Sequence, residues 1–219
     1  MLLRSGMRSG VLVAAIMLAG VASTSVTAQE SVTGNPQRGK QLSYTCLGCH
    51  GIEGWKNAYP NYSVPRLEGQ HPEYLAAALK EYRDGDRAHL TMHSQASSLS
   101  DQDIADIVSY FAGKPLTADA KPVGSVPAPA QLCTSCHGAN GVGITAQYPT
   151  LAGQHPDYIV RALEEYKKGG RKHPVMSSMA ATVKDEDMPV IAEYFSKQLP
   201  PLATESRPAT SFGKSESGR

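Results

Sequence analysis

Cys46-Leu47-Gly48-Cys49-His50 is the stretch that decides the fold of this chain, and its pattern returns as Cys133-Thr134-Ser135-Cys136-His137. Each stretch is a CxxCH motif, and together the two contain all four cysteines of the 219 residues. Four cysteines in an exported protein would first suggest two disulfides. A disulfide scaffold, however, gives no reason for a histidine directly after each pair. The spacing therefore indicates a chemical role for each Cys-Cys-His set.

The CxxCH pattern is typical of covalent haem attachment. The two thiols form thioethers to the haem vinyl groups, and the imidazole of the next residue reaches the iron from one face. A zinc site would need four ligands, and each half offers only three in a tight cluster. A thioredoxin-like redox motif would need a surrounding βαβ pattern, which is missing. The sequence therefore predicts two haem c groups, attached to Cys46, Cys49, Cys133 and Cys136, with His50 and His137 as iron ligands.

The two motifs belong to an internal repeat. Three further patterns recur at an offset of 84 residues, whereas the CxxCH motifs are 87 residues apart. One ancestral module of about 80 residues has therefore been duplicated. The recurring patterns are Gly69-Gln70-His71-Pro72 with Gly153-Gln154-His155-Pro156, Arg87-x-His89-x-x-Met92 with Arg171-x-His173-x-x-Met176, and Tyr110-Phe111 with Tyr194-Phe195.

The repeat sets the domain organisation. Residues 114–129 are rich in proline and read as an extended linker. Arg4 and Arg8 precede an apolar run of about 12 residues, and Val26-Thr27-Ala28 resembles a peptidase site, as in a secretory signal. The run is short for a membrane span, although an uncleaved anchor is the alternative. We therefore expect a signal peptide at 1–28, domains at 29–113 and 130–199 flanking the linker, and a disordered tail at 200–219.

Each module is expected to be helical. Pro72 suits a first helical position, an apolar stripe follows it, and Gly85 ends the helix. The same pattern repeats from Pro156 to Lys168. A last helix opens at Ser100 with a weak capping-box signal, and its copy spans about 184–196, where Pro189 would delay the first full turn. So small and loop-rich a module needs a covalently held macrocycle to complete its core.

The second iron ligand must come from elsewhere in each module. Met92 and Met176 occupy equivalent positions in a loop before the last helix, and thioether ligation raises the reduction potential. A lone methionine is usually core filler, but the repeated position favours Met92 and Met176 as metal ligands. His89 and His173 also repeat, so bis-His ligation is the alternative. Arg87 and Arg171 are candidate propionate partners or solvated surface residues.

The ordered set of CxxCHG, Pro-x-Leu-x-Gly-Gln, Arg-x-His-x-x-Met, Asp-x-Asp and Tyr-Phe, present twice over residues 34–199, resembles the diheme cytochrome c4 family of class I c-type cytochromes. The resemblance implies an all-α fold of two tandem cytochrome c-like domains and His/Met iron in both. It also implies that the Pro65 and Pro149 carbonyls orient His50 and His137, and that Gly39 packs against Tyr110.

The second copy departs from the family pattern at one corner. The first copy has a helix-compatible stretch at 36–45, whereas the second has Val126-Pro127-Ala128-Pro129-Ala130 before its motif. Two prolines argue against a long helix there. We therefore expect the second domain to have a reduced N-terminal helix.

The composition and the resemblance together indicate an exported electron carrier. The formal net charge of +1 argues against nucleic-acid binding through bulk charge. The resemblance implies a periplasmic location, redox partners such as a terminal oxidase, a bc-type complex or a dehydrogenase, and no substrate turnover of its own. Peripheral membrane association stays open. The competing hypotheses are a cytochrome subunit of a periplasmic dehydrogenase and a diheme peroxidase or thiosulfate-oxidising enzyme, which would need an open or unusually ligated haem.

Overall fold

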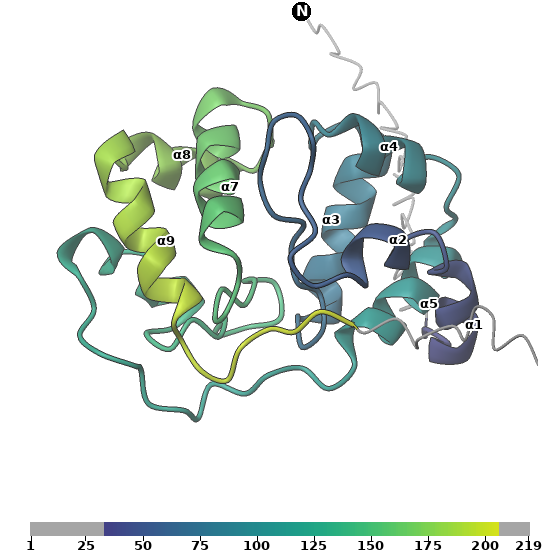
Figure 1. Cartoon of the computed structure of the whole chain (residues 1–219), viewed down its shortest axis with the longest axis horizontal. Coiled ribbons are helices and arrows are strands. Elements are labelled where there is room, and N and C mark those ends of the chain that lie inside the picture. Colours follow the sequence, from purple (N-terminus) through teal and green to yellow (C-terminus); the bar gives the residue numbers. More distant parts are fainter. Residues whose placement is uncertain (1–32, 206–219) are drawn as a thin grey trace, which may run out of the picture. The chain divides into compact units, whose positions relative to one another are not determined.

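The computed structural model describes residues 33–205, and within that range all regular elements are helices joined by long loops (Figure 1). The predicted signal peptide at 1–28 and residues 206–219 of the predicted tail lie outside the described residues. The first domain contains α1 (Pro36–Leu42), α2 (Leu47–His50), α3 (Pro72–Asp84), α4 (Leu90–Ala96) and α5 (Asp101–Ala112). The second contains the 3₁₀ helix η1 (Ala128–Ala130), α6 (Thr134–His137), α7 (Pro156–Lys168), α8 (Pro174–Thr182), the 3₁₀ helix η2 (Asp185–Asp187) and α9 (Met188–Ser196).

The long helices begin and end where local chemistry requires it. Proline occupies the first position of both α3 and α7, where its missing N–H has no intrahelical partner to lose. Both helices end at a glycine with positive φ, 84° at Gly85 and 78° at Gly169, a conformation that side chains with a Cβ disfavour. The Ser100–Asp103 capping box opens α5, whereas η2 precedes α9 because Pro189 delays its first full turn.

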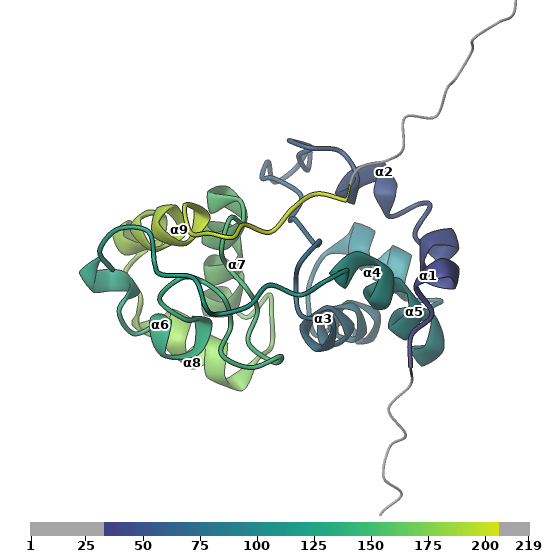
Figure 2. The ribbon, with the colours of Figure 1, turned by 90° about the horizontal axis from the view of Figure 1, so that it is seen from below.

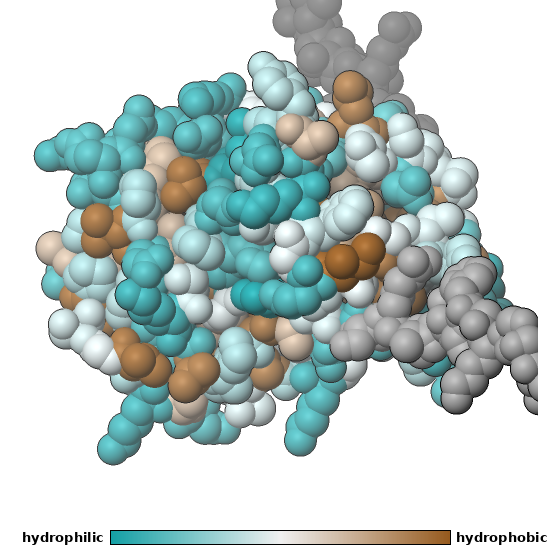
Figure 3. Space-filling model, viewed as in Figure 1, coloured by the Kyte–Doolittle hydropathy of each residue, from teal (hydrophilic) through white to brown (hydrophobic). Residues whose placement is uncertain are grey.

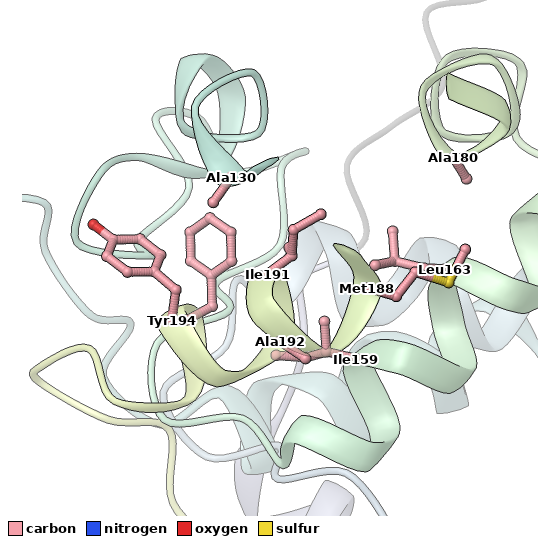
Figure 4. Close-up of a cluster of buried hydrophobic side chains, with 9 residues drawn as sticks. Ala130, Ile159, Leu163, Ala180, Met188, Ile191, Ala192 and Tyr194 are labelled. Carbon is pink, nitrogen blue, oxygen red and sulfur yellow. The ribbon is translucent and has the colours of Figure 1, made fainter. Parts of the chain in front are cut away.

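Each domain has its own small hydrophobic core. In the first, α3 and α5 bury side chains that include Leu75, Ile104 and Phe111. In the second, α7 and α9 bury Ile159, Ile191 and their neighbours (Figure 4). Cys46 packs against the first core, and Cys133 and Met176 pack against the second, so each core borders a predicted site.

The expected difference between the domains is present at the corner before each CxxCH motif. In the first domain α1 crosses α5, and Gly39 packs against the Asp106 carbonyl and the Tyr110 side chain. In the second domain η1 takes this place, and its fully buried Ala130 points toward the side chains of α9 (Figure 4). Two prolines in three residues shorten the element, as the sequence predicts.

The two ends of the second domain are tied to other segments. The Gln198 side chain accepts a hydrogen bond from the N–H of linker residue Val123 and donates one to its carbonyl. Beyond α9, the side chain of Leu202 is buried, at 2% exposed. Residues 200–205 leave α9 and reach the first domain (Figure 2), where Ala203 pairs with Glu68 in an antiparallel bridge. The sequence predicts a disordered tail from residue 200 onward. These residues instead form an ordered segment, which we call the C-terminal strap (residues 200–205).

The surface visible in Figure 3 carries small, separate hydrophobic groups among polar side chains. Scattered apolar residues of this kind are normal for a globular protein. Within residues 33–205, no helix is both long enough and apolar enough to cross a membrane.

Candidate haem-binding sites

The two CxxCH motifs form the same short helix. In each case the first cysteine precedes a four-residue helix, and the histidine ends it. In the first motif, Cys46, Cys49 and His50 line the same cavity. All four cysteines lie among the described residues, and none is in a disulfide. Burial raises the pKa of the Cys46 and Cys133 thiols, which is unlike the lowered pKa of a nucleophilic redox cysteine.

The two motif histidines are held in one orientation. Nδ1 of His50 lies 3.0 Å from the Pro65 carbonyl oxygen, and Nδ1 of His137 lies 2.9 Å from that of Pro149. A carbonyl oxygen can only accept, so Nδ1 is the donor and Nε2 keeps its lone pair. Burial lowers the pKa of both rings, which favours this neutral form. Each histidine therefore presents an unprotonated nitrogen that suits a metal.

A cavity of about 220 Å³ opens beside His50. Cys46, Cys49 and His50 line it together with Met92, so the structure brings these four predicted residues to one space. Its apolar walls include side chains of α3 and α5, such as Leu75, Leu79 and Phe111. It continues to residues of the second domain, including Thr150 and Tyr158. The first site is therefore completed by the other domain.

The sequence predicts that the two methionines lie in loops. In the structure they lie on the first turns of α4 and α8. His89 and His173 cap these helices, and each Nδ1 accepts a hydrogen bond of 3.2 Å from the backbone N–H of Met92 or Met176. Capping fixes the start of each helix and hence the position of its methionine. It also gives the two histidines a structural role.

Arg87 and Arg171 are not surface residues. Each is 2% exposed, and their backbones pair with each other at the contact between the domains. Arg87 donates to the hydroxyls of Tyr74 at 3.2 Å and Tyr158 at 3.1 Å, but its buried Nε has no partner. Arg171 donates to Glu165 at 2.6 Å. The sequence alone does not decide whether these two arginines are buried, since no local pattern shows that the two loops meet.

The residues present fit a haem c. The first cavity offers two thiols, a ring with a free Nε2 and a thioether within mainly apolar walls. A buried guanidinium with an unpartnered Nε lines the same cavity and suits an acidic group such as a propionate. The equivalent residues of the second domain keep the same ring-to-carbonyl bond and helix cap.

Two tandem helical domains with a CxxCH helix in each define a class, the c-type cytochromes. The Cytochrome c family model matches residues 36–113 and again 128–198. Cytochrome c4 from Pseudomonas aeruginosa is 34% identical and covers 77% of this chain and 91% of its own length. The thiosulfate dehydrogenase electron acceptor of Thiomonas intermedia is 28% identical, with 70% of this chain and 78% of that protein covered.

Solved structures agree with the sequence relatives. Reduced recombinant cytochrome c4 from Pseudomonas stutzeri superposes with a TM-score of 0.60 at 28% identity, covering 76% of this chain and all of that one. The thiosulfate dehydrogenase TsdBA from Marichromatium purpuratum gives a TM-score of 0.60 at 29% identity, covering 78% of this chain and 41% of that one. The chain belongs to the diheme cytochrome c4 family. It is an electron-transfer cytochrome with two covalently bound haem c groups.

Proposed function

We propose that this cytochrome is a periplasmic electron carrier whose two haems are both ligated by histidine and methionine. The assigned residues are Cys46, Cys49, His50 and Met92 in the first domain and Cys133, Cys136, His137 and Met176 in the second. The single observation that carries the assignment is that Cys46, Cys49, His50 and Met92 line one cavity.

The protein's own part would be to hold the histidine and the methionine of each pair in place. A bound haem c supplies an iron that changes between two oxidation states. The Pro65 and Pro149 carbonyls keep Nε2 of each histidine unprotonated. The His89 and His173 caps set the first turns that carry the methionines. Because Nδ1 of each capping ring accepts a hydrogen bond from the backbone, the neutral ring carries its proton on Nε2. This arrangement supports methionine over bis-His ligation.

If His50 with Met92 and His137 with Met176 hold the two irons, neither iron would have a free position for a substrate, which supports a carrier without turnover. A ferric near-infrared Met–iron band equal to two methionine-ligated haems tests the assignment. Met92→Ala and Met176→Ala should each remove half of it. A wild-type spectrum without the band would overturn the assignment. Detectable peroxide or thiosulfate turnover would overturn the non-enzymatic role.

A second candidate role is that of electron acceptor for a periplasmic dehydrogenase. It is supported by the thiosulfate dehydrogenase electron acceptors among the relatives, one of them from Stutzerimonas stutzeri at 29% identity. Stopped-flow reduction by a thiosulfate dehydrogenase and oxidation by a terminal oxidase would be compared at equal concentrations. Faster exchange with the dehydrogenase, with co-purification, would favour this role. Gel filtration as a lone monomer would favour the free carrier.

A further inference from the structure

Two buried glutamines bind the backbone of the opposite domain. Gln70 and Gln154 are equivalent in the repeat and are 3% and 4% exposed. The Gln70 amide donates to the Thr150 carbonyl at 2.9 Å, and its Oε1 accepts from the Thr150 N–H at 2.8 Å. Gln154 holds Arg66 in the same way, with both bonds at 3.0 Å. The domain contact therefore contains the same two-bond clamp twice, once in each direction.

Each clamped N–H belongs to a peptide group that also binds a motif histidine. The Arg66 N–H and the Pro65 carbonyl are two ends of one peptide group, and that carbonyl accepts from His50. The Thr150 N–H and the Pro149 carbonyl form the other such group, which accepts from His137. A chain of two hydrogen bonds thus runs from each histidine, through one peptide group, to the glutamine of the other domain.

We propose that Gln70 and Gln154 are positioning residues that act across the domain contact, Gln154 on His50 and Gln70 on His137. The proposal rests on the assignment of the two histidines as iron ligands. An N–H that donates to glutamine polarises its peptide group and makes the carbonyl a stronger acceptor. A stronger acceptor at Nδ1 makes Nε2 more electron-rich and favours oxidised iron. Each glutamine therefore lowers the reduction potential of the haem in the opposite domain.

The orientation of both amides is fixed by a third hydrogen bond. Oε1 of Gln70 also accepts from the His71 N–H, and Oε1 of Gln154 from the His155 N–H, both at 3.0 Å. An oxygen that faces two N–H donors and a nitrogen that faces a carbonyl leave only one amide assignment. Because both side chains are buried, water is a poor substitute for either clamp. The position of each Pro carbonyl therefore depends on the two domains staying in contact.

The test uses the full chain with both haems. Methionine resembles glutamine in length but has no amide, so Gln154→Met and Gln70→Met remove the clamp. Haem-methyl proton resonances followed through a redox titration report each haem separately. Gln154→Met should raise the potential of the first-domain haem more than that of the second, and Gln70→Met should do the reverse. In the reduced protein, the Nδ1–H resonance of His50 should move upfield in Gln154→Met, and that of His137 in Gln70→Met.

Gln198→Met is the matched control. Gln198 is 1% exposed and clamps Val123 through the same two bonds, at 2.8 and 3.1 Å, but that peptide binds neither motif histidine. Gln198→Met should lower stability and leave both potentials unchanged. The proposal is wrong if Gln70→Met and Gln154→Met change the reduction potentials of both haems equally, change mainly that of the haem in their own domain, or change neither.

A second pair of variants covers the case in which the methionine proteins do not assemble. A carboxylate is the stronger acceptor, so Gln154→Glu and Gln70→Glu should lower the potential of the opposite haem more than that of their own. A larger effect on the same domain would overturn the proposal. A wild-type protein without the Met–iron band would instead contradict the ligand assignment. If the wild-type protein shows the Met–iron band but the variants do not mainly change the potential of the haem in the opposite domain, only the glutamine proposal is contradicted.

Discussion

The two copies of the repeat reach the same site with different supports. The first copy has α1, which crosses α5 through Gly39 and leads into Ser43, a fully buried residue three positions before Cys46. The second copy has only η1, yet its Ala130 is equally buried and also stands three positions before its first cysteine. The site therefore requires a small buried residue and a turn before CxxCH. A full helix precedes them in the first copy, where α1 stands, and a 3₁₀ turn takes its place in the second.

The segments that connect and follow the two domains also contact them. Asn140 donates to the linker carbonyls of Ala118 and Ala120, and Gln198 clamps Val123. The linker thus binds the second domain through these contacts, in the copy that has no helix before its motif. The C-terminal strap then returns to the first domain at Glu68. The strap also accepts a hydrogen bond from Tyr110 through Glu205, so the connecting segments contact both copies.

The largest effect is expected at the helix crossing that only the first copy has. In Gly39→Ala, the new Cβ would overlap the Asp106 carbonyl oxygen, which is backbone and has no freedom to turn away. We expect a loss of about 3 kcal/mol or more in the free energy of unfolding. Guanidinium unfolding of the holoprotein, with a separate signal for each haem, measures it. Gly170→Ala is the control, since its nearest atoms would lie at 3.6 Å. Equal stability of the two variants would contradict the prediction.

The strap is expected to give the next largest effect. Leu202 is 2% exposed and its N–H donates to the Ala152 carbonyl at 2.9 Å. Leu202→Ala removes a buried side chain at the end of the second domain and should cost about 2–4 kcal/mol. Leu199 lies directly before the strap and is 53% exposed, so Leu199→Ala should change stability by less than about 0.5 kcal/mol. Thermal unfolding of both variants tests the contrast, and similar midpoint temperatures would mean that burial of Leu202 does not stabilise the protein.

A third contrast compares the carboxylates at equivalent positions in α3 and α7. Glu165 accepts from Arg171 at 2.6 Å and from Arg161 at 2.7 Å, and its side chain is 8% exposed. Glu81 lies 3.8 Å from Arg87 and is 26% exposed. Glu165→Gln would leave Arg171 buried without its charge partner and should cost about 3 kcal/mol. Glu81→Gln should cost less than about 1 kcal/mol. Urea unfolding measures both, and an equal loss would contradict the comparison.

Local patterns in the sequence predicted the parts of the fold that local chemistry controls. The proline starts and glycine ends of α3 and α7, the capping box of α5 and the delayed start of α9 are confirmed, as is the reduced helix of the second copy. The methionine ligands stay a prediction. Their placement on the first turns of α4 and α8 was missed, since a histidine cap is a rare signal.

Contacts between the copies could not be predicted, because they depend on how two separate helical units meet. The Gly-Gln-His-Pro repeat showed only that Gln70 and Gln154 recur. Their clamps on Thr150 and Arg66 join residues 80 and 88 positions apart. The burial of Arg87 and Arg171 follows from the same contact. Likewise, the polar and charged composition beyond Pro200 gave no sign that Leu202 of the strap would be buried.

The smallest expected effect is a pH-dependent change in stability, and it concerns a carboxylate that only the first copy has at this position. Asp106 accepts from the Asn35 N–H at 2.7 Å and pairs with Arg38, whereas the second copy has the exposed Val190 at this position. The Asn35 bond is the main cause that lowers the pKa of Asp106. The Ser100 hydroxyl is the main cause that lowers the pKa of Asp103 to about 2.

A carboxyl whose pKa is lowered by folding stabilises the protein above its unfolded pKa of about 3.9, and this stability is lost as the pH falls through the folded pKa. Asp106→Asn keeps an oxygen for Asn35 but loses the charge facing Arg38. It should therefore cost about 1 kcal/mol at pH 7, and the difference from wild type should shrink between about pH 5 and pH 2. Urea unfolding at several pH values, read at the first-domain haem, measures this. A difference that stays constant down to pH 2 would mean that packing at the α1–α5 crossing, and not the charge of Asp106, stabilises the helix that the second copy lacks.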